Sequence, residues 1–241
     1  MAPSYTGWPM LRASIGYTQR GCRLACSFCV VPRKEGAVRE VATLREVWRG
    51  EPYPRDLILL DNDFFGQPRW PGLIDEANRE GFRLCWSQGI NARMLNDRTA
   101  RAIASVRYMD DQFQRPRLYT AWDGRKDERT LMRGLEALKR AGVAPNRVMV
   151  YMLIGHEPGE THEDRDYRRR KLREFGCRPY PMPITRAGEL GAELVAFQRW
   201  VIQRKDEFKP WAEWWGKARG NPRKLGSRRV SLPLFSGDDD A

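Results

Sequence analysis

The chain has 241 residues, of which 41% are hydrophobic and 31% charged, which suits one domain, or one domain with an appendage. No apolar run approaches the ~20 residues that a membrane span needs, and residues 1–11 lack the basic-then-apolar order of a secretory signal. The net charge of +12 attracts polyanions, so nucleic acid or a phosphorylated substrate is a candidate partner, although many arginine-rich proteins are simply basic.

Apolar, β-prone segments alternate with helix-like segments, a pattern that predicts repeated βα units and a parallel sheet. The expected strands are residues 11–17, 56–60, 82–86, 118–122, 147–154 and 178–184. The expected helices are residues 43–49, 71–80, 98–105, 128–141 and 161–175. Six strands favour an α/β fold with a partial (βα)6 barrel over a closed barrel of eight strands.

The sequence changes character near its C-terminus, and we place a boundary between a core of residues 1–188 and an extension of residues 189–241. A closing helix is predicted by four apolar residues at helical spacing, Leu190, Leu194, Phe197 and Val201. A basic tail follows, with indoles at Trp211, Trp214 and Trp215. Aromatic rings can stack on bases while Lys and Arg neutralise phosphates, but the same tryptophans can instead cover the open side of the barrel.

Three cysteines, Cys22, Cys26 and Cys29, lie on one short loop after the first expected strand, with the spacing C-x3-C-x2-C. Thiolates are the usual ligands of iron–sulfur clusters, and a cubane normally takes four, so three leave one iron open. A structural zinc site needs four ligands, whereas Cys85 and Cys177 stand alone in or beside apolar runs. A Cys3His zinc site has no local pattern here, and a disulfide framework fits poorly in a chain of this length.

This spacing, with Phe28 just before the third cysteine, resembles the signature of the radical S-adenosylmethionine (SAM) enzymes. The resemblance implies a [4Fe–4S] cluster on Cys22, Cys26 and Cys29, with the open iron chelated by SAM. It implies reductive cleavage of SAM to methionine and a 5′-deoxyadenosyl radical, which abstracts hydrogen from a substrate. The implied fold is the partial barrel of that superfamily. An external donor of the flavodoxin or ferredoxin kind is the implied electron source, and an oxygen-sensitive cofactor points to the cytoplasm.

The resemblance extends from about residue 13 to residue 202. Asp61, Asn62 and Asp63 follow the second expected strand, where the family carries a motif that holds the amino group of SAM. They look like the D-D-N-F version of the cobalamin-associated branch and depart from the common Gly-Gly-Glu-Pro form. Ile154 and Gly155 lie in a run similar to the strand-five motif that flanks the adenine.

Asp123 stands where the family often places a residue that binds the ribose hydroxyls. A carboxylate suits a vicinal diol because it can accept two hydrogen bonds, although Asp123 can also be an acid at a helix N-terminus. Each of these features follows an expected strand, and the carboxyl ends of parallel strands meet at one mouth. The sequence therefore predicts one site built from several loops.

The third expected strand is followed by the polar side chains Ser87, Gln88 and Asn91, which can face SAM or the substrate. Arg93 or Arg125 can pair with the SAM carboxylate in a bidentate manner, and surface charge is the alternative role for both. His156 can relay protons or be a loop residue with a satisfied hydrogen bond.

Residues 197–201 look like the closing segment of small, core-only radical SAM proteins, including some found in phage genomes. Nothing before the core is large enough for a cobalamin-binding domain of ~100 residues. No further cysteine cluster suggests an auxiliary iron–sulfur centre. We therefore expect a minimal enzyme rather than a cobalamin-dependent or two-cluster one.

Three hypotheses on function remain. The first is a radical SAM enzyme that modifies a nucleobase in DNA or RNA, which must be flipped out if it lies in a duplex. The second is a radical SAM enzyme acting on a peptide or small metabolite, with the positive charge serving a carboxylate or phosphate. The third is a non-catalytic iron–sulfur protein for electron transfer or nucleic-acid binding.

Overall fold

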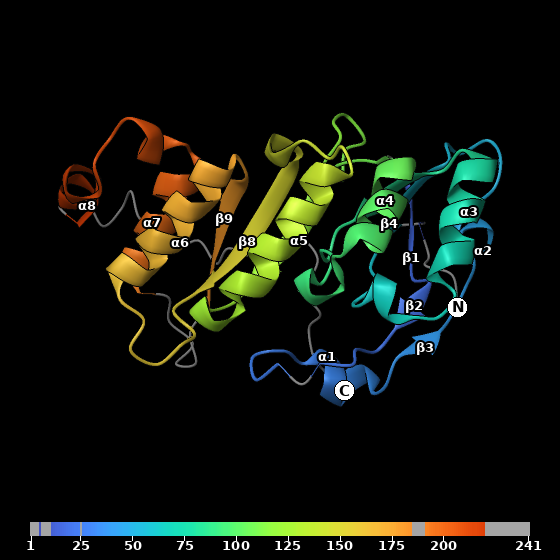
Figure 1. The fold of residues 1–241 in the computed structure, drawn as a ribbon, viewed down its shortest axis with the longest axis horizontal. Helices are drawn as coiled ribbons and strands as arrows, with labels where there is room; N and C mark the ends of the chain where they lie inside the picture. The colour runs from blue at the N-terminus through green and yellow to red at the C-terminus, as the bar shows by residue number, and fades with distance from the viewer. Residues whose placement is uncertain (1–4, 6–10, 25, 185–190, 220–241) are drawn as a thin grey trace.

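The computed structural model describes residues 5, 11–24, 26–184 and 191–219 (Figure 1). Its framework is two parallel sheets. The first has the order β1 (Ser14–Gly16), β4 (Asp56–Leu59), β5 (Arg83–Trp86), β6 (Arg107–Tyr108). The second has the order β7 (Leu118–Trp122), β8 (Val148–Ile154), β9 (Arg178–Pro183). The expected α/β architecture with parallel strands is confirmed.

The two sheets are joined through the loop that follows β5. Ile90 forms a parallel bridge with Thr120, its backbone nitrogen donates to the Tyr119 carbonyl oxygen at 2.7 Å, and the Thr120 hydroxyl donates back to the Ile90 carbonyl at 2.7 Å. All six expected strands are present, with ends that differ by up to three residues. β6 and the antiparallel pair β2 (Gln19–Arg20) and β3 (Arg39–Glu40) were not expected.

Helices cover one face of the sheets, in front of the strands in Figure 1. They are α2 (Leu44–Val47), α3 (Trp70–Glu80), α4 (Asp97–Ser105), α5 (Glu128–Arg140) and α6 (His162–Phe175). Their ends follow local chemistry, since Asn96 and Thr161 cap α4 and α6 with their side chains. Gly81 and Gly176 end α3 and α6 in the left-handed conformation. None of the helices in the described part of the chain is long and apolar enough to cross a bilayer.

The core lies mainly between the helices and the sheets, where it includes Leu57, Trp86 and Trp122. Alternate strand residues face the other way and form a smaller cluster around Cys85 and Tyr119. Both isolated cysteines are buried, as their apolar surroundings in the sequence indicate. Burial raises the pKa of the Cys177 thiol to about 12, so it stays protonated at neutral pH.

The expected closing helix is α7 (Ala192–Ile202), and a further helix, α8 (Trp211–Arg219), follows it. The Gln198 side chain donates to the Pro181 carbonyl at 3.0 Å, which fixes α7 beside β9. Trp211 stacks on His162 with ring centroids 4.6 Å apart, and the Trp214 indole donates to the Ala196 carbonyl at 3.1 Å. Trp211 and Trp214 are therefore engaged in packing. Leu190 and the basic residues from 220 onward lie outside the described residues.

Candidate functional site

The cysteine loop leaves β2 and leads into α1 (Val31–Glu35), beside β3 at the lower part of Figure 1. Cys22, Cys26 and Cys29 are all free and half-buried. A turn closes the second half of the loop, because the Cys29 nitrogen donates to the Cys26 carbonyl at 3.0 Å. Gly21 has a φ of +77°, and a side chain there would overlap the Ala37 carbonyl oxygen, so the residue before Cys22 must be glycine.

The three thiols lie within electrostatic range of one another. Burial raises the pKa of the Cys22 thiol, and Asp63 and Cys29 raise it further. Burial also raises the pKa of Cys26, with added contributions from Asp123, Cys29 and Cys22. No three His, Cys, Asp or Glu side chains among the described residues are arranged as a metal site. The donor set nevertheless suits an iron–sulfur cluster, because thiolates are its preferred ligands and bound metal ions deprotonate coordinating thiols.

Asp61, at the end of β4, ties that strand to the segment that enters the cysteine loop. Its carboxylate is 3% exposed and accepts hydrogen bonds from the backbone nitrogens of Thr18 at 2.7 Å and Gln19 at 3.2 Å. The Thr18 hydroxyl donates to it as well. Burial raises the pKa of Asp61 to about 7 despite these donors. The side chain of Asp61 therefore positions the loop, because all three hydrogen bonds join it to Thr18 and Gln19 just before the cysteines.

Asp63 and Asn62 hold the loop from the same strand end. The Asp63 carboxylate is 1% exposed and pairs with Arg23, inside the cysteine motif, at 2.7 Å. The Asn62 amide donates to Glu35 at 3.1 Å. Glu35 also accepts from the Gly21 nitrogen at 2.9 Å and pairs with Arg20 at 2.7 Å. The sequence interpretation missed Glu35 and Arg23, and the only signal for Arg23 was its place between two cysteines.

The loop after β8 touches the cysteine loop directly. The Phe28 ring meets the His156 ring edge-on with centroids 5.0 Å apart. Ser27 Oγ lies 3.1 Å from His156 Nε2. Gly155 has a φ of +78° and its nitrogen donates to Glu160 at 2.5 Å, which shapes this turn. Ile154, at the end of β8, is fully buried in the core beneath the helices.

Asp123, at the end of β7, is half-buried beside the cysteine loop. Burial raises the pKa of its carboxyl group, Asp127 raises it further, and Arg93, Arg168 and His156 lower it. Among the residues that the structure describes, none donates a hydrogen bond to this carboxylate. The Asp123 carboxylate can therefore still accept hydrogen bonds from a ligand.

A buried arginine that the sequence interpretation missed holds the ends of β7 and β8 together. Arg168 of α6 is 1% exposed and donates to the Trp122 carbonyl at 3.0 Å and the Leu153 carbonyl at 2.9 Å. It also forms an ion pair with Glu160. These bonds place Asp123 and His156 next to each other at the same edge. In the sequence, Arg168 is one of many charges in α6 and carries no separate signal.

Within the described part of the chain, most of the other predicted site residues are bonded to neighbouring groups of the protein, and one of them, Gln88, is not. The Ser87 hydroxyl donates to the Leu59 carbonyl at 3.2 Å, and the Asn91 side chain accepts from the Arg93 nitrogen at 3.0 Å. Gln88 is half-buried and its side chain has no hydrogen-bond partner among the described residues. Arg93 pairs with Asp127 at 3.0 Å. Arg125 pairs with Asp164 at 2.8 Å, so both candidate partners of the SAM carboxylate already bind acids.

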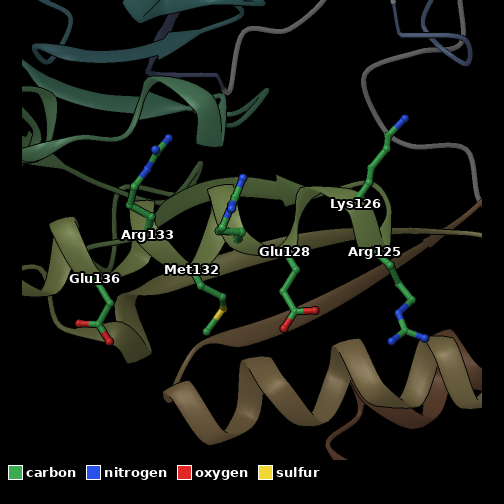
Figure 2. Close-up of a pocket in the computed structure, with 7 residues that line it drawn as sticks. Arg125, Lys126, Glu128, Met132, Arg133 and Glu136 are labelled. Carbon is green, nitrogen blue, oxygen red and sulfur yellow. The ribbon is translucent and has the colours of Figure 1, made fainter.

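Two surface pockets lie outside the cysteine loop. One, of about 610 Å³, is formed by α5 and by Arg125 and Lys126 of the loop that follows β7 (Figure 2). Figure 2 shows Lys126 and Arg133 pointing the opposite way from Glu128 and Met132. The other, of about 640 Å³, includes Asn146 and Arg178 at the start of β8 and β9. Neither pocket is lined by a cysteine of the loop.

The loops that follow β2, β4, β5, β7 and β8 thus meet around the three cysteines. Arg23 of the cysteine loop binds Asp63 and Met94, which follow β4 and β5. Asp123, which follows β7, acts electrostatically on Cys26, and His156, which follows β8, packs against Phe28. No protein-family model matches this chain, and no curated protein matches it. The candidate site therefore rests on its residues and their geometry.

Proposed function

We propose that this chain is a radical SAM enzyme. The cofactors would be a [4Fe–4S] cluster held by Cys22, Cys26 and Cys29 and SAM on the open iron, which together supply a 5′-deoxyadenosyl radical that abstracts hydrogen from the substrate. The observation that carries the proposal is the convergence of four later strand-end loops on the three-cysteine loop. A structural zinc module or an electron carrier has no need of so many polar loops around its ligands.

The chain's own residues divide the work of holding this site. Asp61, Glu35 and Arg23 fix the backbone of the cysteine loop, so the thiols are presented from a preorganised turn. Asp123 offers a carboxylate with open acceptor positions beside that turn, which suits the ribose diol of SAM. Phe28 and His156 close the loop toward β8 and limit the access of water.

The fold that we propose for this chemistry is the partial (βα)6 barrel of the radical SAM type. Its support is that β1, β4 and β5 are parallel neighbours in one sheet, that β7, β8 and β9 are parallel neighbours in the other, and that the parallel bridge of Ile90 with Thr120 joins the two sheets. The carboxyl ends of such strands form one mouth, and the cysteine loop lies at that end. Free thiols and an oxygen-sensitive cluster suit the reducing cytoplasm, with an external protein as electron donor.

The proposed substrate is a nucleobase in DNA or RNA, either an ordinary base or one that already carries a modification. Its support is the net charge of +12, which favours a polyanion over a neutral metabolite. The packing of Trp211 and Trp214 removes two of the aromatic rings that could have stacked on bases. A peptide or small-metabolite substrate is the second candidate, because the same charge also suits a carboxylate or phosphate.

The decisive experiment is anaerobic reconstitution with iron and sulfide, followed by reduction in the presence of SAM and chromatography for 5′-deoxyadenosine. We expect about four iron atoms per chain and formation of 5′-deoxyadenosine. Cys26→Ala should abolish both, whereas the control Cys177→Ala, which changes a buried thiol far from the loop, should retain both. A stable cluster that yields no 5′-deoxyadenosine would sink the proposal and favour a non-catalytic iron–sulfur protein.

The substrate class is tested with the same assay. DNA, RNA and peptide pools are added separately, and the rate of 5′-deoxyadenosine formation is compared with the uncoupled rate. We expect stimulation by nucleic acid and a mass change in the recovered nucleosides. Stimulation by peptides alone would assign the second candidate.

A further inference from the structure

An arginine stands at the start of every strand in the two parallel sheets. The residues are Arg12, Arg55, Arg83, Arg107, Arg117, Arg147 and Arg178, each at the first position of its strand or one or two residues before it. We call this set the arginine edge. Parallel strands all begin on the same side of a sheet, so these arginines line one edge.

The strand register confirms that neighbouring arginines lie next to each other. Arg83 pairs directly with Arg107 across β5 and β6. Arg117 and Arg147 immediately precede the paired residues Leu118 and Val148. The cysteine loop lies at the carboxyl ends of the strands, on the opposite edge. The seven residues of β8 alone separate the two edges by about 20 Å.

Most of the arginine edge lacks acidic partners. Arg83 forms a bidentate pair with Asp56 at 2.6 Å, and Arg55 lies 3.9 Å from Glu80. The other five form no salt bridge with a carboxylate among the residues that the structure describes, and the nearest acidic influences are Asp110 on Arg117 and Glu207 on Arg178. An unpaired row of cations repels itself, so the edge gains stability when an anion binds along it.

The strongest concentration of unpaired charge lies between β7 and β9. Arg117 is 8% exposed, yet it donates only to the Asn146 carbonyl, at 2.9 Å. Arg178 donates to the same oxygen at 3.2 Å. Burial lowers the pKa of Arg117, and the nearby Arg178 lowers it further. Two guanidinium groups therefore share one neutral acceptor.

The adjoining pocket of about 640 Å³ opens Arg178 of this pair to solvent on the β9 side. Arg178 and Asn146 both line it. The pocket's other arginines are engaged, since Arg169 and Arg173 bind Asp206 and Arg204 binds Glu207. Arg178 is therefore the arginine of this pocket that forms no salt bridge among the described residues, with Glu207 as the nearby acid.

We propose that the arginine edge binds the phosphate backbone of a nucleic acid, separately from the cysteine loop. Guanidinium forks match phosphate oxygens in a bidentate manner. Adjacent strands are spaced by ~4.8 Å, so the edge presents a row of forks that suits a polymer of phosphates better than a single anion. This surface goes beyond the proposed radical chemistry, because a strand held here contacts the protein on the side away from the cysteines.

The test is fluorescence anisotropy of the full chain with labelled 20-nucleotide DNA and RNA single strands, titrated at several salt concentrations. The edge variant is R107Q/R147Q/R178Q. The matched control is K126Q/R129Q/R133Q, which removes the same charge from the α5 pocket of Figure 2. Both variants keep the C-terminal tail, so their difference isolates the edge.

Arg117 is buried, so we expect a salt slope near −2.8 if the four accessible arginines, Arg12, Arg107, Arg147 and Arg178, each contact a phosphate, at about −0.7 per contact for single strands. The edge variant should lose about 2 units of slope and bind on the order of 100-fold more weakly at 0.1 M salt. The control should change by no more than a few-fold. Replacement by lysine, R107K/R147K/R178K, keeps the charge and should retain most of the slope, which separates lost contacts from misfolding.

Equal losses in the edge variant and the control would overturn the proposal, because net charge alone would then explain binding. Unchanged binding in the edge variant would overturn it as well. The C22A/C26A/C29A variant, which cannot carry the cluster, should bind the strands as the parent does. In the reconstituted parent, absence of 5′-deoxyadenosine formation together with normal strand binding would count against the enzyme proposal alone.

Discussion

The carboxylate of Asp61 is bound by Thr18 through two hydrogen bonds, one from the backbone nitrogen at 2.7 Å and one from the hydroxyl group. The two residues are 43 positions apart and belong to different strand ends. This contact fixes where the chain turns into the cysteine loop. It also places an ionisable group in a nearly water-free environment, with consequences for pH dependence.

We predict that Asp61 makes the protein less stable as pH rises toward neutrality. Burial raises its pKa from 3.8 to about 7, so its contribution is fully present below about pH 4 and is lost as pH rises to 7. The shift corresponds to about 4 kcal/mol across this window. Asp61→Asn should remove this dependence, measured as the free energy of unfolding in urea at pH 5, 6 and 7. The exposed control Asp75→Asn should follow the parent, and parallel pH profiles for the parent and Asp61→Asn would contradict the prediction.

A second prediction concerns the buried pair of Arg168 and Glu160. Arg168→Met leaves the buried Glu160 carboxylate with only Arg165, at 3.7 Å, as a cationic partner and frees two strand-end carbonyls, so we expect a loss of about 3 kcal/mol in urea unfolding. The double variant Arg168→Met/Glu160→Gln should recover much of the lost free energy of unfolding, because the amide carries no charge. The control Arg170→Met, which breaks an exposed pair with Asp166 on the same helix, should cost less than about 1 kcal/mol. Similar losses in the free energy of unfolding at both positions would show that the bonds of Arg168 to the strand ends do not stabilise the fold.

Gly21 and Gly36 offer a matched pair of substitutions. Both have a positive φ, but a side chain at Gly21 would overlap the Ala37 carbonyl, whereas nothing lies within 4 Å of one at Gly36. Gly36→Ala should cost only the backbone term of about 1–2 kcal/mol and keep its iron content. Gly21→Ala should displace the loop before Cys22 and lower the iron bound after reconstitution. Equal iron contents in the two variants would show that the loop tolerates this displacement.

Asp123→Asn should weaken SAM binding without loss of the cluster. An ionised acceptor makes stronger hydrogen bonds to the ribose hydroxyls than a neutral amide, by about 1.5 kcal/mol or more in total, so the Kd should rise about tenfold or more. Isothermal titration of the reconstituted protein measures this, with visible absorbance as the check on the cluster. The control Asp97→Asn changes an exposed carboxylate that pairs with Arg140 and should leave the Kd unchanged. An unaltered Kd in Asp123→Asn would remove Asp123 from the SAM site.

The elements that the sequence predicts well are those with local determinants. Thr161 caps α6 and Gly176 ends it because capping depends on residues within one turn. The strands are buried apolar runs of the expected length. β2, β3 and β6 were missed because strands of two residues carry no periodic pattern.

The candidate site was predictable in position but not in its internal pairing. Asp61, Asp123 and Gly155 follow strands, and the topology brings strand ends together. Which acid meets which base depends on distances of a few ångströms across the fold. With 43 basic and 31 acidic residues, the sequence offers many combinations, so the pair of Arg93 with Asp127 had no distinctive signal.

The order of the strands bears on how the protein is assembled during synthesis. Neighbours in each sheet follow one another along the chain, so each new βα unit can dock on the one made before it. The cysteine loop belongs to the first unit, yet its contact between Ser27 and His156 spans 129 residues. The thiols therefore leave the ribosome before β8 does, and the loop gains its last strand-end contact only once β8 has been made. If the chain carries the proposed cluster, this interval would give a cellular iron–sulfur delivery system access to the loop before the nascent chain closes over it.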